Sequence, residues 1–214
     1  MNENSGSSPR PVWVRVLGVD PAAAGPTGYG IIETDFRTCR VLRYGALRVA
    51  AKRQKVSAGA VLRDVHQLLC RLIEEFTPVA MAVESVFTAL NMRTALRLAE
   101  VRGVVLLAAE QNGVTVRSYS PREVKACVAG YGHADKKQMQ MMVRALLSMS
   151  ETPEPSDAAD ALAVALCHIQ GQQLERRFGV EQALARKPSA SGRDRLARES
   201  HATQTRGSGI QSNQ

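Results

Sequence analysis

The sequence predicts an α/β protein with a mixed five-stranded sheet, in which three antiparallel strands precede two parallel ones. The first observation is a run of three strand-like segments near the N-terminus, joined by short polar connections. The second is that strands alternate with amphipathic helices in the second half, which implies parallel pairing there. At 214 residues the chain has room for one domain of common size and a tail.

The strands are expected where valine-rich or alternating runs stop at turn residues; "VWVRVLGVD", for example, ends at the Pro/Gly turn "PAAAGPTGYG". The expected strands are 12–20, 28–34, 40–49, 78–86 and 114–120. Helices are expected where apolar residues recur every three or four positions. They cover 57–76, 93–111, 121–129, 136–149 and 156–169.

Two helices carry further signals. "SPRE" combines a capping serine, Ser120, with proline at the first helical position and Glu123 three residues after the cap, so a helix should begin there. In 93–111 the residues Leu96, Ala99 and Gly103 lie along one stripe together with Leu106. The domain is expected to span 12–170, between a flexible leader, 1–11, and a basic, largely disordered tail, 171–214, in which 172–187 could still form a helix.

The chain is basic, with 28 Lys+Arg against 20 Asp+Glu, a net charge of +8 and a pI of about 9.7. This charge favours a polyanionic partner such as nucleic acid. Four of the eight excess charges lie in the tail, where a solvated segment and a DNA-binding arm are both open readings. The four cysteines are widely spaced, and the longest apolar run is "VVLLAA", so we expect a soluble, cytoplasmic protein with reduced thiols.

Four acids are the candidate catalytic residues. Asp20 and Glu84 end the first and fourth strands, and Asp157 and Asp160 begin the helix "SDAADALAVALCHI". Each has a plain alternative, because acids cap turns and favour helix N-termini. If the first and fourth strands are neighbours and this helix crosses their ends, the four carboxylates converge and require cations. Such oxygen ligands suit two Mg²⁺ ions, or Mn²⁺, in phosphodiester cleavage.

The chain from about residue 14 to 169 resembles the RuvC-type Holliday-junction resolvases. The motifs "LGVDP…TGYG", "VESVF…N…AL.L…RGV", "YSPREVK…GYG.A.K.Q" and "DAADALAVAL" occur in family order. The resemblance implies a ribonuclease-H-like fold with Asp20, Glu84, Asp157 and Asp160 as catalytic, metal-binding acids. It also implies a homodimer, formed through the helix 93–110, that nicks two strands of like polarity in a four-way DNA junction. The products would carry 5′-phosphate and 3′-hydroxyl ends, and the partners implied are the RuvA and RuvB branch-migration proteins.

The same resemblance implies three DNA contacts. Phe87 matches a loop aromatic that stacks on bases near the junction centre, although without the resemblance a core position is the simpler interpretation. Lys125 and Lys136 match basic positions that support DNA binding and cleavage, and a solvated helix face is their alternative. Ala22 and Ser85 replace the family's usual glycine and glutamine, and the first turn is one residue longer.

Two other classes of protein remain open. "DPAAAGPTGYG" resembles the phosphate loop of actin-like and sugar-kinase-like ATP-binding proteins, although the chain is too short for their second lobe. A DNA-binding module that relies on charge alone is the other, and it predicts that the four acids are dispensable.

Overall fold

The computed structural model describes residues 12–22, 26–47, 57–85 and 91–185, with side chains as far as residue 178. The strands are β1 Val14–Asp20, β2 Thr27–Thr34, β3 Cys39–Leu47, β4 Ala80–Glu84 and β5 Thr115–Tyr119. The helices are α1 Ala58–Phe76, α2 Met92–Gln111, α3 Pro121–Ala129, α4 Lys136–Leu146 and α5 Ser156–Ala185. The expected order of elements is confirmed.

The five strands form one sheet in the order β3-β2-β1-β4-β5. β1 pairs antiparallel with β2, and β2 with β3, whereas β1–β4 and β4–β5 are parallel. The mixed sheet predicted from the sequence is therefore confirmed, as is the adjacency of the first and fourth strands on which the convergence of the acids depended.

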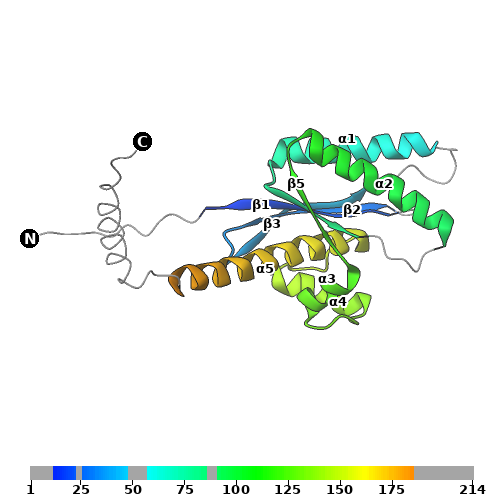
Figure 1. The fold of residues 1–214 in the computed structure, drawn as a ribbon. Coiled ribbons are helices and arrows are strands. Elements are labelled where there is room, and N and C mark those ends of the chain that lie inside the picture. The colour runs from blue at the N-terminus through cyan, green and yellow to red at the C-terminus, as the bar shows by residue number, and fades with distance from the viewer. Residues whose placement is uncertain (1–11, 23–25, 48–56, 86–90, 186–214) are drawn as a thin grey trace, which may run out of the picture. The chain divides into compact units, whose positions relative to one another are not determined.

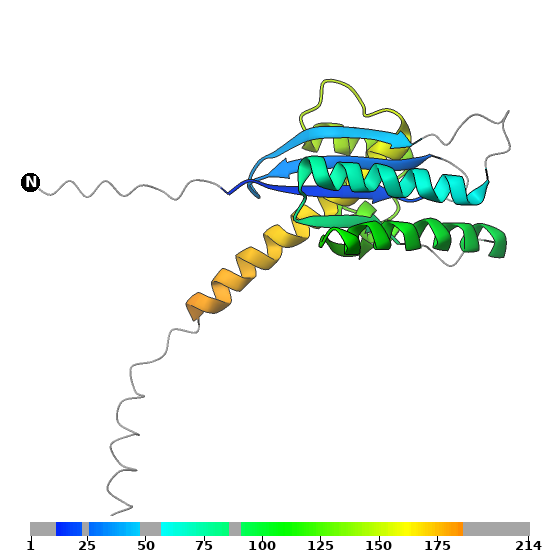
Figure 2. The same cartoon turned by 90° about the horizontal axis from the view of Figure 1, so that it is seen from above.

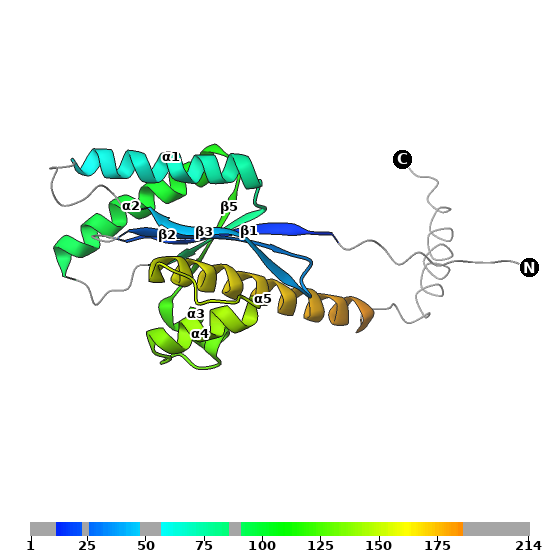
Figure 3. The ribbon, with the colours of Figure 1, turned by 180° about the vertical axis from the view of Figure 1, so that it is seen from behind.

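Helices cover both faces of the sheet (Figure 1). α1 and α2 lie side by side on one face (Figure 2), and α5 lies on the other with α3 and α4 beyond it (Figure 3). Alternate residues of β1 feed the two cores: Val16 packs with α3, α4 and α5, whereas Leu17 and Val19 pack with α1 and α2. The three central strands, β1, β2 and β4, are thus buried on both faces, whereas the edge strands β3 and β5 are partly exposed.

Three glycines let α5 approach the sheet closely. A Cβ added to Gly18 would stand 2.0 Å from the carbonyl oxygen of Ala161, and one added to Gly28 would stand 1.9 Å from that of Asp157. A Cβ on Gly30 would meet the side chain of Leu162 at 2.6 Å. Any side chain at these positions would push the helix away, so the glycines set the position of its first turns.

α2 presents a different face to the core from the stripe noted in the sequence. Its buried residues are Val101, Val105, Ala108 and Ala109. The stripe of Leu96, Ala99, Gly103 and Leu106 is exposed instead, together with Met92 and Leu107. This helix is apolar on two faces, and periodicity alone does not say which of them meets the sheet.

α5 continues to Ala185, past the domain boundary expected at residue 170. The chain divides after Gln173 into two compact units, and the sheet, the first four helices and the start of α5 belong to the first. The expected leader, 1–11, and the segment 186–214 lie outside the described residues. Among the helices that are described, none is long and apolar enough to cross a membrane.

Candidate active site

Asp20 and Glu84 end neighbouring parallel strands and point to the same face of the sheet. In β1 the side chains alternate, so Asp20 shares a face with Val16 and Gly18, which is the face that α5 covers. Glu84 follows the same rule in β4, two residues after Ala82. Because Val19 pairs with Val83, the next residue of each strand brings the two acids side by side.

The N-terminal end of α5 brings the other two acids to the same place. Gly28 pairs with Asp20 across β1 and β2, and the backbone of Asp157 lies directly on Gly28. Residues 158–169 of α5 are buried except for Asp160, which is half-buried. Asp157 is the second residue of the helix, which begins at Ser156, so it lies in the first turn and is not the capping residue. Asp160 lies beyond the first turn.

The pKa values of the acids show that the carboxyl groups interact. Burial is the largest cause that raises the pKa of Asp20 to about 8, and the negative charges of Glu84 and Asp160 raise it further. Asp20 and Glu84 also share a hydrogen bond. Burial likewise raises the pKa of Glu84 and that of Asp160, and the charge of Asp157 adds to the effect on Asp160. The site therefore resists holding all of its carboxylates ionised together.

Two lysines stand at the edge of this cluster, each on a helix with a defined start. Lys125 follows the capping box of Ser120 and Glu123 on α3, and its charge lowers the pKa of Glu84 and of Asp160. Lys136 is the first residue of α4, and its Nζ lies 3.3 Å from Oδ2 of Asp160. Burial is the largest single cause acting on the pKa of Asp160, which stays raised despite both cations.

The four acids supply oxygen ligands that suit a hard divalent cation, but they are not arranged as a ready-made metal site. In the described part of the chain, no three His, Cys, Asp or Glu side chains are grouped so that they could hold a metal ion as they stand. The donor set itself fits, because four carboxylates that repel one another supply the oxygen atoms that Mg²⁺ and Mn²⁺ prefer. A cation would replace the proton that Asp20 holds.

The structure describes only some of the loop positions that the sequence singled out. Phe87 and the longer first turn, 23–25, lie outside the described residues. Ser85 is described: its backbone N–H donates to the carbonyl of Tyr119 at 2.8 Å and extends the pairing of β4 with β5 by one residue. Ala22 is half-buried, and nothing in the structure ties it to the acids.

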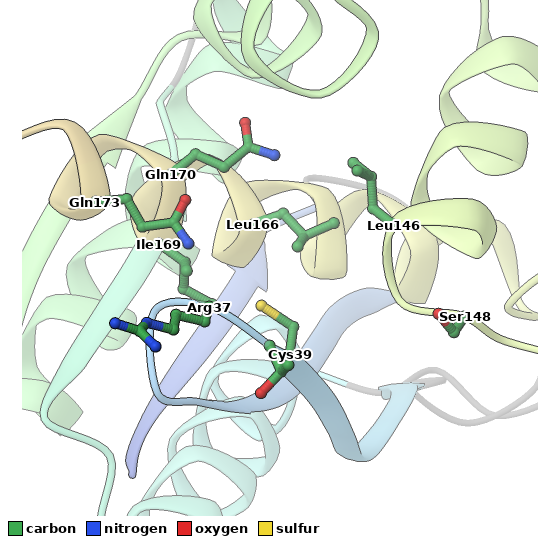
Figure 4. A pocket seen from close by; sticks show the side chains of 9 residues that line it. Arg37, Cys39, Leu146, Ser148, Leu166, Ile169, Gln170 and Gln173 are labelled. Carbon is green, nitrogen blue, oxygen red and sulfur yellow. The ribbon is translucent and has the colours of Figure 1, made fainter. Parts of the chain in front are cut away.

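The packing of Gly28 and Gly30 speaks against the phosphate-loop reading of "DPAAAGPTGYG". Both glycines belong to β2 and face α5, so helix backbone and side chain fill the space that a nucleotide phosphate would need. The pocket in Figure 4, about 370 Å³ in volume, lies farther along α5 and is lined by residues such as Cys39, Leu166 and Gln173. None of the four acids lines it.

The family model that matches this chain is that of the crossover junction endodeoxyribonuclease RuvC, over residues 16–168. That range contains all four acids and nearly all of the sheet and of both cores. The chain belongs to the RuvC family. Its ribonuclease-H-like fold is the one expected from the resemblance. The RuvC protein of Halothermothrix orenii is 40% identical over 166 residues, which are 78% of this chain and 98% of that protein.

Further RuvC proteins support the same family assignment. That of Caldicellulosiruptor saccharolyticus is 43% identical over 157 residues, 73% of this chain and 92% of its own length. Among solved structures, Thermus thermophilus RuvC in complex with a Holliday junction substrate superposes with a TM-score of 0.69 at 32% identity, covering 75% of this chain and 96% of that one. The yeast mitochondrial resolvase Ydc2, at 17% identity and a TM-score of 0.55, shares the fold.

The sequence alone missed the part that Gly18, Gly28 and Gly30 play in the site. The signal was present, since "TGYG" places glycines at alternate positions of one strand and "LGVD" places a glycine in its neighbour, where side chains would normally face the core. The contact between Lys136 and Asp160 has no comparable signal. The two residues are distant in sequence, and the local sequence around one does not indicate the position of the other.

Proposed function

We propose that this protein is an endonuclease that resolves four-way (Holliday) DNA junctions in recombination and repair. It nicks two strands of like polarity symmetrically and leaves 5′-phosphate and 3′-hydroxyl ends. The observation that supports the proposal most directly is the meeting of Asp20 and Glu84 with the start of α5, within a chain of the RuvC family. The solved complex of the Thermus relative with a Holliday junction substrate supports the choice of DNA.

The family is one of metal-dependent nucleases, and we assign the metal here to Asp20, Glu84, Asp157 and Asp160, with two Mg²⁺ ions as the natural occupants and Mn²⁺ as a substitute. When bound, such a pair activates a water molecule and stabilises the leaving 3′ oxygen. The chain's own contribution is to bury the carboxylates and to fix them through the contact of α5 with the sheet. The repulsion between carboxylates that helps to raise the pKa values of Asp20, Glu84 and Asp160 would be relieved by a bound cation.

Lys125 and Lys136 are the residues we assign to phosphate contacts. Both lie beside the acids, which would otherwise repel the DNA backbone. Lys136 is largely exposed, with 59% of its side chain accessible, so it can turn from Asp160 to a phosphate at little cost. Phe87, three residues after Glu84, remains our candidate for stacking on bases at the junction centre.

The exposed face of α2 supports a homodimer. Met92, Leu96 and Leu107 are exposed on this helix, at 75%, 58% and 50%, beside the small residues Ala99 and Gly103. An exposed apolar stripe of this kind marks an interaction surface, and two copies related by a twofold axis would present two active sites to the two strands of a junction. RuvA and RuvB are the partners proposed by resemblance, and the four free thiols agree with a cytoplasmic location.

The test is nicking of a synthetic four-way junction by the full chain in Mg²⁺, with a linear duplex of the same sequence as the control. We expect paired nicks in strands of like polarity, ligatable products and no cutting of the duplex. Tight junction binding without cleavage at any divalent concentration would favour the DNA-binding module instead.

A further inference from the structure

Tyr119 is the last residue of β5, and its side chain reaches across to α5. The hydroxyl oxygen lies 2.7 Å from Nδ1 of His168. The two rings meet edge to face, with centroids 6.0 Å apart and planes at 66°. Because a phenol can both donate and accept, the hydrogen bond forms with either tautomer of the imidazole. A polar contact and a ring contact therefore join β5 to α5 at this point.

The backbone of Tyr119 fixes the end of β4. In the parallel pairing of the two strands, Tyr119 lies opposite Glu84. Its carbonyl accepts the backbone N–H of Ser85 at 2.8 Å, so the peptide that follows Glu84 is bonded to it as well. The backbone that carries the Glu84 carboxylate is thus bonded to the residue whose side chain contacts α5.

The residue after Tyr119 begins α3. Ser120 caps this helix: its hydroxyl oxygen accepts the N–H of Glu123 at 3.2 Å, and its own N–H donates to Oε2 of Glu123 at 2.6 Å. The direction in which α3 leaves the sheet therefore depends on where Tyr119 lies. Lys125, whose charge lowers the pKa of Glu84, is on this helix. Three elements of the candidate site, β4, α3 and α5, meet at Tyr119.

α5 contacts the sheet in two separate places. Near its start, the backbone of Ala161 lies against Gly18 of β1. About two turns beyond Asp160, His168 meets Tyr119 of β5. A helix that touches a sheet at one place can pivot about it, whereas two contacts set its direction. The bond between Tyr119 and His168 therefore restrains the helix that carries Asp160.

This bond has a structural role in any case. His168 is buried, with 5% of its surface exposed, and a buried imidazole needs a partner for its nitrogen. Loss of the Tyr119 hydroxyl should therefore destabilise the fold. A purely structural role predicts this loss alone, whereas a role in the site predicts that the affinity for metal changes as well.

We propose that Tyr119, through its hydrogen bond to His168, is a positioning residue that sets Glu84 and the acids of α5 at the spacing a divalent cation requires. The proposal rests on the proposed function, which assigns the metal to these acids. Tyr119 contacts neither metal nor DNA and acts through the backbone of β4 and through α5. Residues that orient metal ligands typically contribute about 10- to 100-fold to metal affinity or activity.

The test measures the affinity of the full chain for Mg²⁺ without DNA. The rise of the unfolding temperature with Mg²⁺ concentration gives an apparent dissociation constant. We expect Tyr119→Phe to lower the unfolding temperature in EDTA and to weaken Mg²⁺ binding about tenfold. His168→Leu should do the same, and the double variant should bind Mg²⁺ no more weakly than either single one.

Two variants serve as controls. His168→Asn keeps an amide near the position of Nδ1 that can bond the phenol, so it should restore most of the Mg²⁺ affinity that His168→Leu loses. Tyr44→Phe removes the hydroxyl of an exposed tyrosine on β3 and should leave the affinity unchanged.

Wild-type Mg²⁺ affinity in a destabilised Tyr119→Phe would reduce the bond to a structural one and overturn the proposal. Additive losses in the double variant, or a wild-type protein that Mg²⁺ does not stabilise, would overturn it too. Junction nicking by the wild type is measured in parallel. If the wild type cuts no junction while the variants still differ in Mg²⁺ affinity, the proposed function fails and the positioning role stands.

Discussion

Replacement of Gly28 by alanine tests how the sheet positions the start of α5, which carries Asp157 and Asp160. The added Cβ would stand 1.9 Å from the carbonyl oxygen of Asp157, whereas ordinary contacts begin at 3.4 Å. Either β2 or the start of α5 must therefore move by about 1.5 Å, a conflict between backbones that no side-chain rotation relieves. A shift of about 1 Å in a catalytic group can cost about a hundredfold in rate.

We therefore expect Gly28→Ala to fold, with a free energy of unfolding lowered by about 1–3 kcal/mol, and to lose about a hundredfold in junction nicking. The assay is single-turnover nicking of a labelled four-way junction, at protein concentrations that saturate binding. Thermal unfolding is followed in parallel, so that loss of activity is compared with the folded fraction.

Gly59→Ala is the matched control. A Cβ at Gly59, near the start of α1, meets nothing within 4 Å, so this variant should be as stable as the wild type or slightly more stable, and fully active. Wild-type nicking by folded Gly28→Ala would refute the claim that the approach of α5 to the sheet sets the geometry of the acids.

Three further predictions address charge and assembly. Because the pKa of Asp20 rises from 3.8 to about 8 on folding, the free energy of unfolding should fall as pH rises through this range. In EDTA, Asp20→Asn should flatten this fall and raise the free energy of unfolding at pH 8 by as much as about 5 kcal/mol, at about 1.4 kcal/mol per pKa unit. The variant should also lose stabilisation by Mg²⁺, and an unchanged slope would contradict this. Lys136→Met should lower the salt slope of junction affinity by about one, measured by fluorescence anisotropy, and an unaltered slope would exclude a phosphate contact. Leu96→Asp should weaken the dimer at least about tenfold in analytical ultracentrifugation, whereas Met141→Asp, equally exposed on α4, should not; equal effects would move the interface away from α2.

The positions of the acids could be predicted from the sequence because strand ends are visible in it. Asp20 and Glu84 each close a valine- or alanine-rich run, and parallel neighbours bring their carboxyl ends together. Asp157 and Asp160 begin an otherwise apolar helix, which must be buried on all sides. These local patterns predict the sheet and the meeting of the acids.

What the sequence did not predict depends on contacts between distant segments. From the sequence, the exposed face of α2 could not be told from its buried face, because apolar residues such as Leu96 and Val105 recur at helical spacing on both. Contact with the sheet decides which of the two faces is buried. The close approach of α5 to Gly28 and the ion pair of Lys136 with Asp160 both arise from tertiary packing. From the sequence, a helix over 172–187 was an open alternative to disorder, because this polar segment carries no clear apolar stripe.

The most direct test of the four-carboxylate account is Asp160→Asn on a synthetic four-way junction. If the four carboxylates hold the metal, this variant binds the junction as tightly as the wild type in the absence of Mg²⁺ and cleaves no strand when Mg²⁺ is added. Asp64→Asn, which changes a carboxylate paired with Arg63 on α1, is the control and should cleave normally. Full nicking by Asp160→Asn in Mg²⁺ would contradict the account.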